Sequence, residues 1–122
     1  MARILIVDDE ASIRTVLDHA LKSAGYEVSL AENGREASKQ QRATPADLAI
    51  VDLFMPDEDG LETIMEFHRE FPNVRLIAIS GNDLSGAILA MAKEFGADRI
   101  LEKPFDNGTM LKLVAELLKR PS

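Results

Sequence analysis

The chain has 122 residues, and its 14 Lys and Arg against 21 Asp and Glu give a formal net charge of −7. With 46% hydrophobic and 29% charged residues, the composition is that of one folded, acidic domain and excludes an intrinsically disordered chain. The absence of cysteine excludes disulfides, thiol nucleophiles and cysteine-ligated metals, so that a metal site has to use carboxylates, His19 or His68.

The first part of the sequence alternates short apolar runs with helical patterns. An apolar run at residues 4–7 precedes a helical pattern over residues 13–24, and Gly25 stands where such a helix ends. A strand is expected at residues 26–30. The next residues have the spacing of a capping box, which predicts a second helix that begins at Asn33 and ends before Pro45.

The rest of the chain repeats this alternation. Apolar runs at residues 48–51, 76–79 and 99–101 are each followed by a helical pattern. The third helix is expected to end before Pro72 and to bury the stripe Leu61, Ile64, Met65 and His68. The fourth is expected over residues 84–95, and Gly96 closes it. Asp106 caps the fifth, whose stripe comprises Met110, Leu113, Val114 and Leu117.

These patterns predict an α/β protein of the (βα)5 type. The apolar runs are continuous rather than alternating, which is typical of strands buried on both faces, as in a parallel sheet that helices cover. Short connections between strands and helices favour right-handed crossovers and one open sheet. In such sheets the ligand site lies at the carboxyl ends of the strands, so the residues that follow the apolar runs are the candidates for function.

Complementary polar groups follow four of the runs. They are Asp8, Asp9 and Glu10 after the first run, Asp52 after the third, Ser80 after the fourth and Lys103 after the fifth. Two carboxylates about 5 Å apart repel by roughly 3 kcal/mol at an effective dielectric constant near 20, so the cluster opposes folding unless a cation lies between the carboxylates. Oxygen ligands of this kind suit Mg²⁺, and a carboxylate beside a lysine is suited to accept a phosphoryl group.

Each of these residues also has an ordinary structural interpretation. An acid at a strand end is often a solvated loop residue, Asp9 has the right position to cap the first helix, and a single serine or lysine is usually part of the surface. Four strand ends that all carry a complementary group argue against this interpretation for the set as a whole.

The four segments resemble the receiver domain of bacterial two-component response regulators, of the chemotaxis-regulator kind, over the whole chain, residues 1–122. The segments are Ile4-Leu5-Ile6-Val7-Asp8-Asp9-Glu10, Val51-Asp52-Leu53-Phe54-Met55-Pro56-Asp57-Glu58-Asp59-Gly60, Ile79-Ser80-Gly81 and Lys103-Pro104-Phe105. The resemblance implies a flavodoxin-like three-layer sandwich with strand order 2-1-3-4-5. It also implies a cis Lys103-Pro104 bond. This expectation rests on the resemblance alone, because only about 5–6% of X-Pro bonds are cis in general.

The resemblance implies a role for each site residue. Asp52 accepts a phosphoryl group from a sensor histidine kinase or a phosphotransfer protein. Asp8, Asp9, Asp52 and the backbone carbonyl of Phe54 bind Mg²⁺, Ser80 binds a phosphoryl oxygen and Lys103 pairs with the phosphorylated aspartate. The domain is then a signalling phosphoacceptor, catalysing only its own phosphorylation and dephosphorylation, and passes the signal to a protein target, an output domain or a second copy through its fourth helix, fifth strand and fifth helix.

The switch region departs from the family. Receivers usually carry an aromatic residue or histidine three residues before the lysine, and this chain has Ile100. Arg99 is an alternative switch residue, although a solvated arginine is the simpler interpretation. Phe54 and Asn82 occupy the positions that tune the lifetime of the phosphate in the family. Gly81 removes a side chain where the phosphoryl group approaches.

Three other functions compete with an active receiver. A haloacid-dehalogenase-type phosphatase has two aspartates separated by one residue after its first strand, whereas Asp8 and Asp9 are adjacent. A flavodoxin has a hydroxyl-rich phosphate loop there, and acids repel a phosphate. A degenerate receiver, used only for protein interactions, is disfavoured because every chemical residue is present. The chain ends about where a receiver's fifth helix ends, which fits a stand-alone regulator and equally a fragment.

The sequence gives further expectations about partners and location. The acidic balance, the single tyrosine and the lack of tryptophan argue against direct binding to nucleic acid, which uses clustered basic and stacking aromatic side chains. The longest apolar run, residues 87–92, is far shorter than the about 20 residues that span a bilayer. The run at residues 4–7 is too short for a signal peptide. We expect a cytoplasmic protein whose partners are proteins and a cation.

Overall fold

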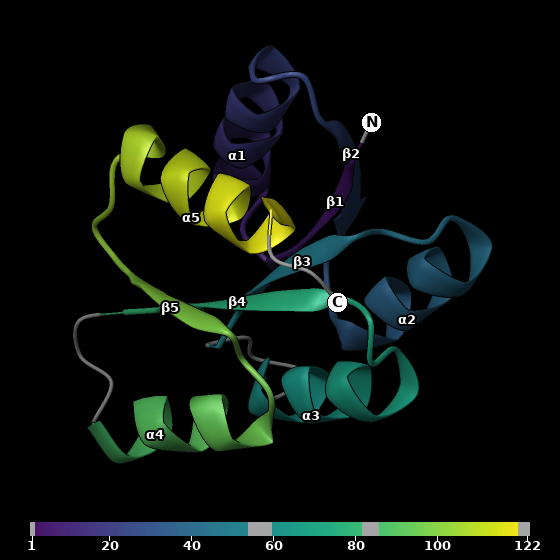
Figure 1. Cartoon of the computed structure of the whole chain (residues 1–122), viewed down its shortest axis with the longest axis vertical. Helices are drawn as coiled ribbons and strands as arrows, with labels where there is room; N and C mark the ends of the chain where they lie inside the picture. Colours follow the sequence, from purple (N-terminus) through teal and green to yellow (C-terminus); the bar gives the residue numbers. More distant parts are fainter. Residues whose placement is uncertain (1, 54–59, 82–85, 120–122) are drawn as a thin grey trace.

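The computed structural model describes residues 2–53, 60–81 and 86–119, and over these residues strands and helices alternate strictly (Figure 1). The bounds of these elements are β1 (Arg3–Val7), α1 (Ala11–Ser23), β2 (Glu27–Ala31), α2 (Gly34–Ala43), β3 (Leu48–Asp52), α3 (Gly60–Glu70), β4 (Arg75–Ser80), α4 (Gly86–Phe95), β5 (Arg99–Glu102) and α5 (Asn107–Lys119). Residues 84 and 85, where the fourth helix was expected to begin, lie outside the described residues.

The strands form one parallel sheet in the order β2-β1-β3-β4-β5. Helices α1 and α5 cover one face of the sheet, and α2, α3 and α4 cover the other (Figure 1). The predicted flavodoxin-like three-layer sandwich and its strand order are therefore confirmed. Because all strands run in the same direction, their carboxyl ends meet at one edge of the sheet.

The central strands are buried on both faces, as their continuous apolar runs predict. Side chains alternate between two cores: Ile4 and Ile6 pack on the side of α1 and α5, whereas Leu5 and Val7 pack on the side of α2, α3 and α4. Every residue of β3 is buried, including Asp52 at its end. A strand in this position holds its terminal side chain in a fixed place because neighbours constrain it from all sides.

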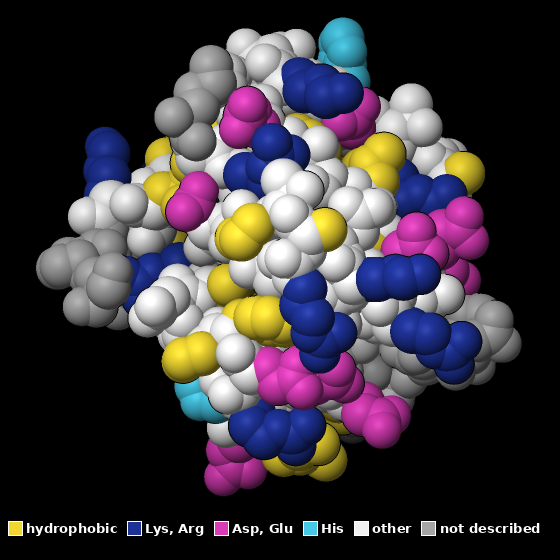
Figure 2. Space-filling view, turned by 90° about the vertical axis from the view of Figure 1, so that its right-hand side faces the viewer, with side chains coloured by type: hydrophobic (Ala, Val, Ile, Leu, Met, Phe, Trp, Pro, Cys, Tyr) yellow, Lys and Arg dark blue, Asp and Glu magenta, His cyan; other side chains and the backbone are white. Residues whose placement is uncertain are grey.

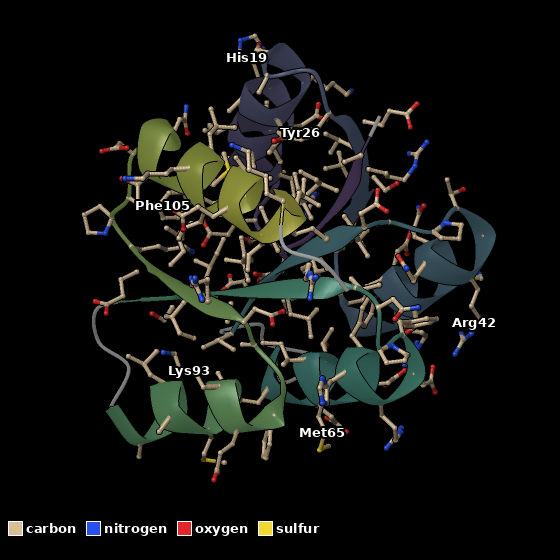
Figure 3. The ribbon with its side chains drawn as sticks, in the orientation of Figure 1. His19, Tyr26, Arg42, Met65, Lys93 and Phe105 are labelled. Carbon is tan, nitrogen blue, oxygen red and sulfur yellow. The ribbon has the colours of Figure 1, made fainter. Side chains whose placement is uncertain are left out.

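The predicted stripe of α3 is shifted in the structure. Met65 is 40% exposed and points away from the sheet (Figure 3), and His68 is also exposed, whereas Phe67 is fully buried. The buried positions are Gly60, Thr63, Ile64 and Phe67, which follow the i, i+3, i+4, i+7 spacing as well as the expected set does. Burial of Gly60 against β3 sets this rotation of the helix, which apolar periodicity alone does not define. In α1, Val16 likewise belongs to the apolar helical pattern of residues 13–24 but is 52% exposed.

Two predicted helix caps are confirmed, whereas the alternative interpretation of Asp9 as a cap is not supported. The Asn33 side chain accepts a hydrogen bond from the Glu36 amide at 2.9 Å, and Asp106 Oδ1 accepts one from the Thr109 amide at 2.7 Å. The N-cap of α1, however, is Glu10 rather than Asp9, and no side-chain cap bond is formed there among the described residues. This leaves the Asp9 carboxylate for another role.

Helices α2 and α3 are joined at the surface by Arg42. Its guanidinium lies 2.8 Å from Glu70 Oε2 and 5.8 Å from the centre of the Phe71 ring (Figure 3). On the side of the molecule that carries α2, basic and acidic side chains are interspersed rather than separated (Figure 2). In the part of the chain that the structure describes, every helix is too short or too polar to cross a membrane.

Candidate functional site

Three carboxylates lie together at the carboxyl edge of the sheet. Asp8 follows β1, Asp9 comes next in the β1–α1 loop, and Asp52 ends β3, the strand beside β1. One carboxylate oxygen of each lies within 4.8 Å of the others. The predicted cluster is thus formed at the ends of two neighbouring strands, and its spacing would allow the three carboxylates to hold one ion.

Two of these carboxylates are buried. The exposed fraction is 0% for Asp8 and 2% for Asp52, whereas Asp9 is exposed. Asp8 Oδ1 accepts a hydrogen bond from the Glu10 amide at 2.9 Å, but Oδ2 has no hydrogen-bond partner among the described residues. A buried carboxylate oxygen without a partner is costly, so a cation or a hydrogen-bond donor that reaches Oδ2 would stabilise the folded protein.

The environment of Asp8 favours its protonated form. Burial is the largest cause, and the negative charges of Asp52 and Asp9 add to it, while the Glu10 amide and Lys103 oppose it. Together these effects raise the pKa of Asp8 from 3.8 to about 6. Near neutral pH the carboxylate is ionised at a cost in stability, which a bound cation would remove.

Lys103 is the cation that the fold itself places in the site. Its Nζ lies 3.7 Å from Asp52 Oδ2 and 3.9 Å from Glu10 Oε1. Its backbone amide donates to the Ser80 carbonyl at 2.8 Å, and the predicted cis bond between Lys103 and Pro104 is confirmed. The pairing with Glu10 was not anticipated from the sequence, since the expected partner of Lys103 was the acceptor alone.

Ser80 ends β4, on the side of β3 opposite to β1. It is fully buried, and its Oγ has no hydrogen-bond partner among the described residues. Asp52 therefore lies between two strands whose ends each carry an unsatisfied polar atom, Asp8 Oδ2 on one side and Ser80 Oγ on the other. Gly81 follows directly and is half-buried.

The remaining predicted residues lie apart from this cluster or cannot be placed. Phe54 and Asn82 lie outside the described residues. Ile100 is half-buried in β5, pairs with Ala78 and packs against the core on the side of α3 and α4. Arg99 donates a hydrogen bond to the Asp98 carbonyl at 3.2 Å.

The structure adds two residues whose roles the sequence did not reveal. Arg14 of α1 donates from Nη1 to the Asp8 carbonyl at 2.6 Å. At Gly60, at the start of α3, a Cβ atom would lie 2.5 Å from Leu53 Cα and would also overlap the Asp52 carbonyl. The lack of a side chain at Gly60 lets the start of α3 contact the backbone of the predicted acceptor.

Replacing Gly60 by Ala is expected to destabilise the protein by about 1–3 kcal/mol, because the backbone at Asp52 and Leu53 has to move to accept the methyl group. Gly86, at the start of α4, is the matched control, since nothing lies within 4 Å of a Cβ atom there. The Gly86→Ala variant is expected to be as stable as wild type or more stable. Urea unfolding of both variants measures the difference, and equal stability would contradict the close contact at Gly60.

An apolar groove lies beside the charged cluster. It has a volume of about 390 Å³ and is lined by Ile13, Val16 and Leu17 of α1 and by Lys103, Pro104 and Phe105 after β5. Lys103 belongs to both the groove and the cluster. A molecule bound in this groove would therefore contact Lys103, whose Nζ lies 3.7 Å from Asp52 Oδ2.

Comparison with known proteins gives consistent matches. The profile of the response regulator receiver domain matches residues 4–115. The chain is 32% identical to the chemotaxis protein CheY of Thermotoga maritima, over 96% of this chain and 98% of that protein. It is 35% identical to the DNA-binding transcriptional regulator NtrC of Rhizobium meliloti, over 98% of this chain. The chain spans only 25% of the length of that NtrC.

A solved structure agrees with these matches. The response regulator protein TrrA of Thermotoga maritima, in complex with Mg²⁺ and BeF, is 34% identical and superimposes with a TM-score of 0.85. The alignment covers 96% of this chain and 99% of that one.

Proposed function

The chain belongs to the response regulator receiver domain family, and from this premise we propose that residues 1–122 form a signalling domain that accepts a phosphoryl group on Asp52. The observation that carries the proposal is the position of Asp52. It is a buried carboxylate beside Lys103, between two strand ends whose polar atoms, Asp8 Oδ2 and Ser80 Oγ, lack partners among the described residues. A cation would satisfy Asp8 Oδ2, and an anionic oxygen would accept a hydrogen bond from Ser80 Oγ.

The acidic residues fit Mg²⁺. Mg²⁺ prefers hard oxygen ligands. The three carboxylates offer such oxygens within 4.8 Å of one another, and Asp8 Oδ2 has no other partner among the described residues. Asp8, Asp9 and Asp52 would hold it, together with the predicted backbone carbonyl of Phe54. When bound, the ion supplies positive charge to the oxygens of the transferring phosphoryl group. The Mg²⁺ complex of the similar TrrA supports this assignment.

The chain's own groups supply the rest of the chemistry. An Asp52 carboxylate oxygen forms a bond to phosphorus while the bond between phosphorus and the donor nitrogen or oxygen breaks, and the leaving group retains the electron pair. The Lys103 ammonium, already beside Asp52, pairs with the negative charge of the product. The Ser80 hydroxyl donates to a phosphoryl oxygen, which gives its buried Oγ the partner that it lacks within the described structure.

The donor that we propose is a protein, either a sensor histidine kinase or a phosphotransfer protein. The groove supports a protein donor because it offers apolar surface, including the exposed Val16, beside Lys103, the residue that pairs with the acceptor. The phosphorylated domain then acts on a protein target, an output domain or a second copy. We place this function in the cytoplasm, where kinases of this type act.

A direct test uses acetyl phosphate as a small donor. Wild-type protein with Mg²⁺ is expected to gain the mass of one phosphoryl group, and hydroxylamine should remove it because an acyl phosphate is labile to this nucleophile. Without Mg²⁺ the protein should gain no phosphoryl group. A degenerate receiver, the main alternative, would gain no mass under any of these conditions, and continuous turnover of phosphate monoesters would instead indicate the phosphatase.

The switch that we propose does not use a rotating aromatic ring. Ser80 moves toward the phosphoryl group, since a charge-assisted hydrogen bond is worth about 1.5–3 kcal/mol. Ile100 follows only slightly because a β-branched side chain has few rotamers and a short reach. The change at the surface of α4, β5 and α5 then comes mainly from the residues after Ser80 and from the start of α4.

Replacing Ile100 by Tyr is expected to strengthen the link between phosphorylation and self-association or target binding, by about fivefold or more. The measurement is sedimentation with and without beryllofluoride, and Ile100→Val is the control because it keeps a β-branched apolar side chain. A large inward movement of Ile100 in the wild-type beryllofluoride complex, with Ser80 unmoved, would contradict this mechanism.

A further inference from the structure

Arg14 holds the loop that carries two of the three clustered carboxylates. This loop consists of Asp8, Asp9 and Glu10, between the end of β1 and the start of α1. Arg14 lies in the first turns of α1, and its backbone amide donates to the Glu10 carbonyl at 3.1 Å. Its guanidinium returns to the same loop and donates to the Asp8 carbonyl at 2.6 Å. One residue thus binds both ends of a three-residue segment.

Asp8 is consequently fixed at three points. Its amide donates to the Ala31 carbonyl of β2 at 3.1 Å, its Oδ1 accepts from the Glu10 amide at 2.9 Å, and its carbonyl accepts from Arg14. Only Oδ2 remains without a partner among the described residues. The direction of this oxygen is set by the other three contacts, and the Arg14 contact is the one in which the partner of Asp8 contributes a side chain.

The contact from Arg14 to the Asp8 carbonyl is important because the three carboxylates of the cluster repel one another. Asp8, Asp9 and Asp52 have ligand oxygens within 4.8 Å of one another, so their mutual repulsion favours any movement of the loop that separates them. A charge-assisted hydrogen bond to a backbone carbonyl resists this movement without occupying a carboxylate oxygen. Arg14 is half-buried, which shields the contact from competing water.

From these contacts we infer that Arg14 is a positioning residue for cation binding: through the Asp8 carbonyl it keeps Asp8 Oδ2 and Asp9 directed toward Asp52. The inference rests on the proposed function, because the cation is Mg²⁺. It assigns to Arg14 no contact with the ion or with the phosphoryl group.

The test compares four arginine variants by calorimetric titration with Mg²⁺. Arg14→Met keeps the apolar stem and removes the donors, and it is expected to weaken Mg²⁺ binding about tenfold, as loss of a group that orients a metal ligand typically does. Arg14→Lys keeps a charged donor and should lose less. Arg35→Ala removes the same charge from the exposed surface of α2, and Arg42→Ala removes the surface contact between α2 and α3. Both should bind Mg²⁺ as wild type does.

A second readout needs no metal. Amide hydrogen exchange at Glu10 reports the bond to Asp8 Oδ1, and it should accelerate in Arg14→Met and remain unchanged in Arg35→Ala. Wild-type affinity in Arg14→Met, or equal weakening in Arg14→Met and Arg35→Ala, would overturn the inference. If wild type binds Mg²⁺ and Arg14→Met binds it equally well, only the inference about Arg14 fails. If wild type itself binds no Mg²⁺, the magnesium part of the proposed function fails, so the two failures are distinguishable.

Discussion

The Asp52→Asn variant is expected to accept no phosphoryl group, whereas every other carboxylate of the chain remains intact. A neutral amide oxygen is a far weaker nucleophile than a carboxylate, and no proton loss near neutral pH restores it. The loss should therefore be complete within the detection limit of intact mass measurement after incubation with acetyl phosphate and Mg²⁺.

Asp18→Asn is the matched control for this experiment. Asp18 lies on α1 and forms a surface pair with Lys22 at 3.2 Å, four residues away, so its replacement changes the same charge far from the cluster. This variant should be labelled at the wild-type rate. Label that appears in Asp52→Asn as fast as in wild type would identify a different acceptor.

The Asp8→Asn variant is expected to be more stable than wild type at pH 7 without Mg²⁺, by up to about 3 kcal/mol. Burial, aided by Asp52 and Asp9, raises the pKa of Asp8 from 3.8 to about 6 in the folded protein. Between these two values the folded state binds more protons at Asp8 than the unfolded state does. The contribution of Asp8 to stability therefore falls as the pH rises from about 4 to 6, and the variant lacks this loss.

Mg²⁺ should largely remove this difference in stability. Wild type gains about 2.7 kcal/mol at a free Mg²⁺ concentration of 100 Kd, whereas Asp8→Asn, like Asp8→Ala and Asp9→Ala, should gain little. Urea unfolding at pH 4.5 and 7, with and without Mg²⁺, measures both effects. A wild type that gains no stability from Mg²⁺, or an Asp8→Asn variant no more stable than wild type in metal-free buffer at pH 7, would contradict the electrostatic interpretation of the cluster.

The fold was predictable because its strongest signals are local. Continuous apolar runs identify the buried strands, and the side-chain caps at Asn33 and Asp106 are formed within four residues. Helix rotation was less predictable. In α3 the stripe through Met65 and His68 and the one through Phe67 have equal periodicity, and the contact of Gly60 with β3 decides between them.

The candidate site shows the same division. Its carboxylates, serine and lysine were predicted because they follow apolar runs directly, and parallel strands bring such positions to one edge. Arg14 and the pairing of Lys103 with Glu10 were not, because both depend on how long side chains fold back across the β1–α1 loop. No spacing rule describes contacts of this kind.

The position of β5 in the sheet affects how a signal can leave the site. In the described structure β5 is bonded to β4 alone, whereas β3 is bonded to strands on both sides. The bond from the Lys103 amide to the Ser80 carbonyl extends this pairing past the end of β5. Because β3 is held on both sides and β5 on one, we expect the strand that carries the acceptor to be stiffer than the edge strand that precedes Lys103. We therefore expect a displacement at Ser80 to shift the edge strand β5 slightly, with little change in the Ile100 side chain, and at less cost than a shift of the strand that carries Asp52.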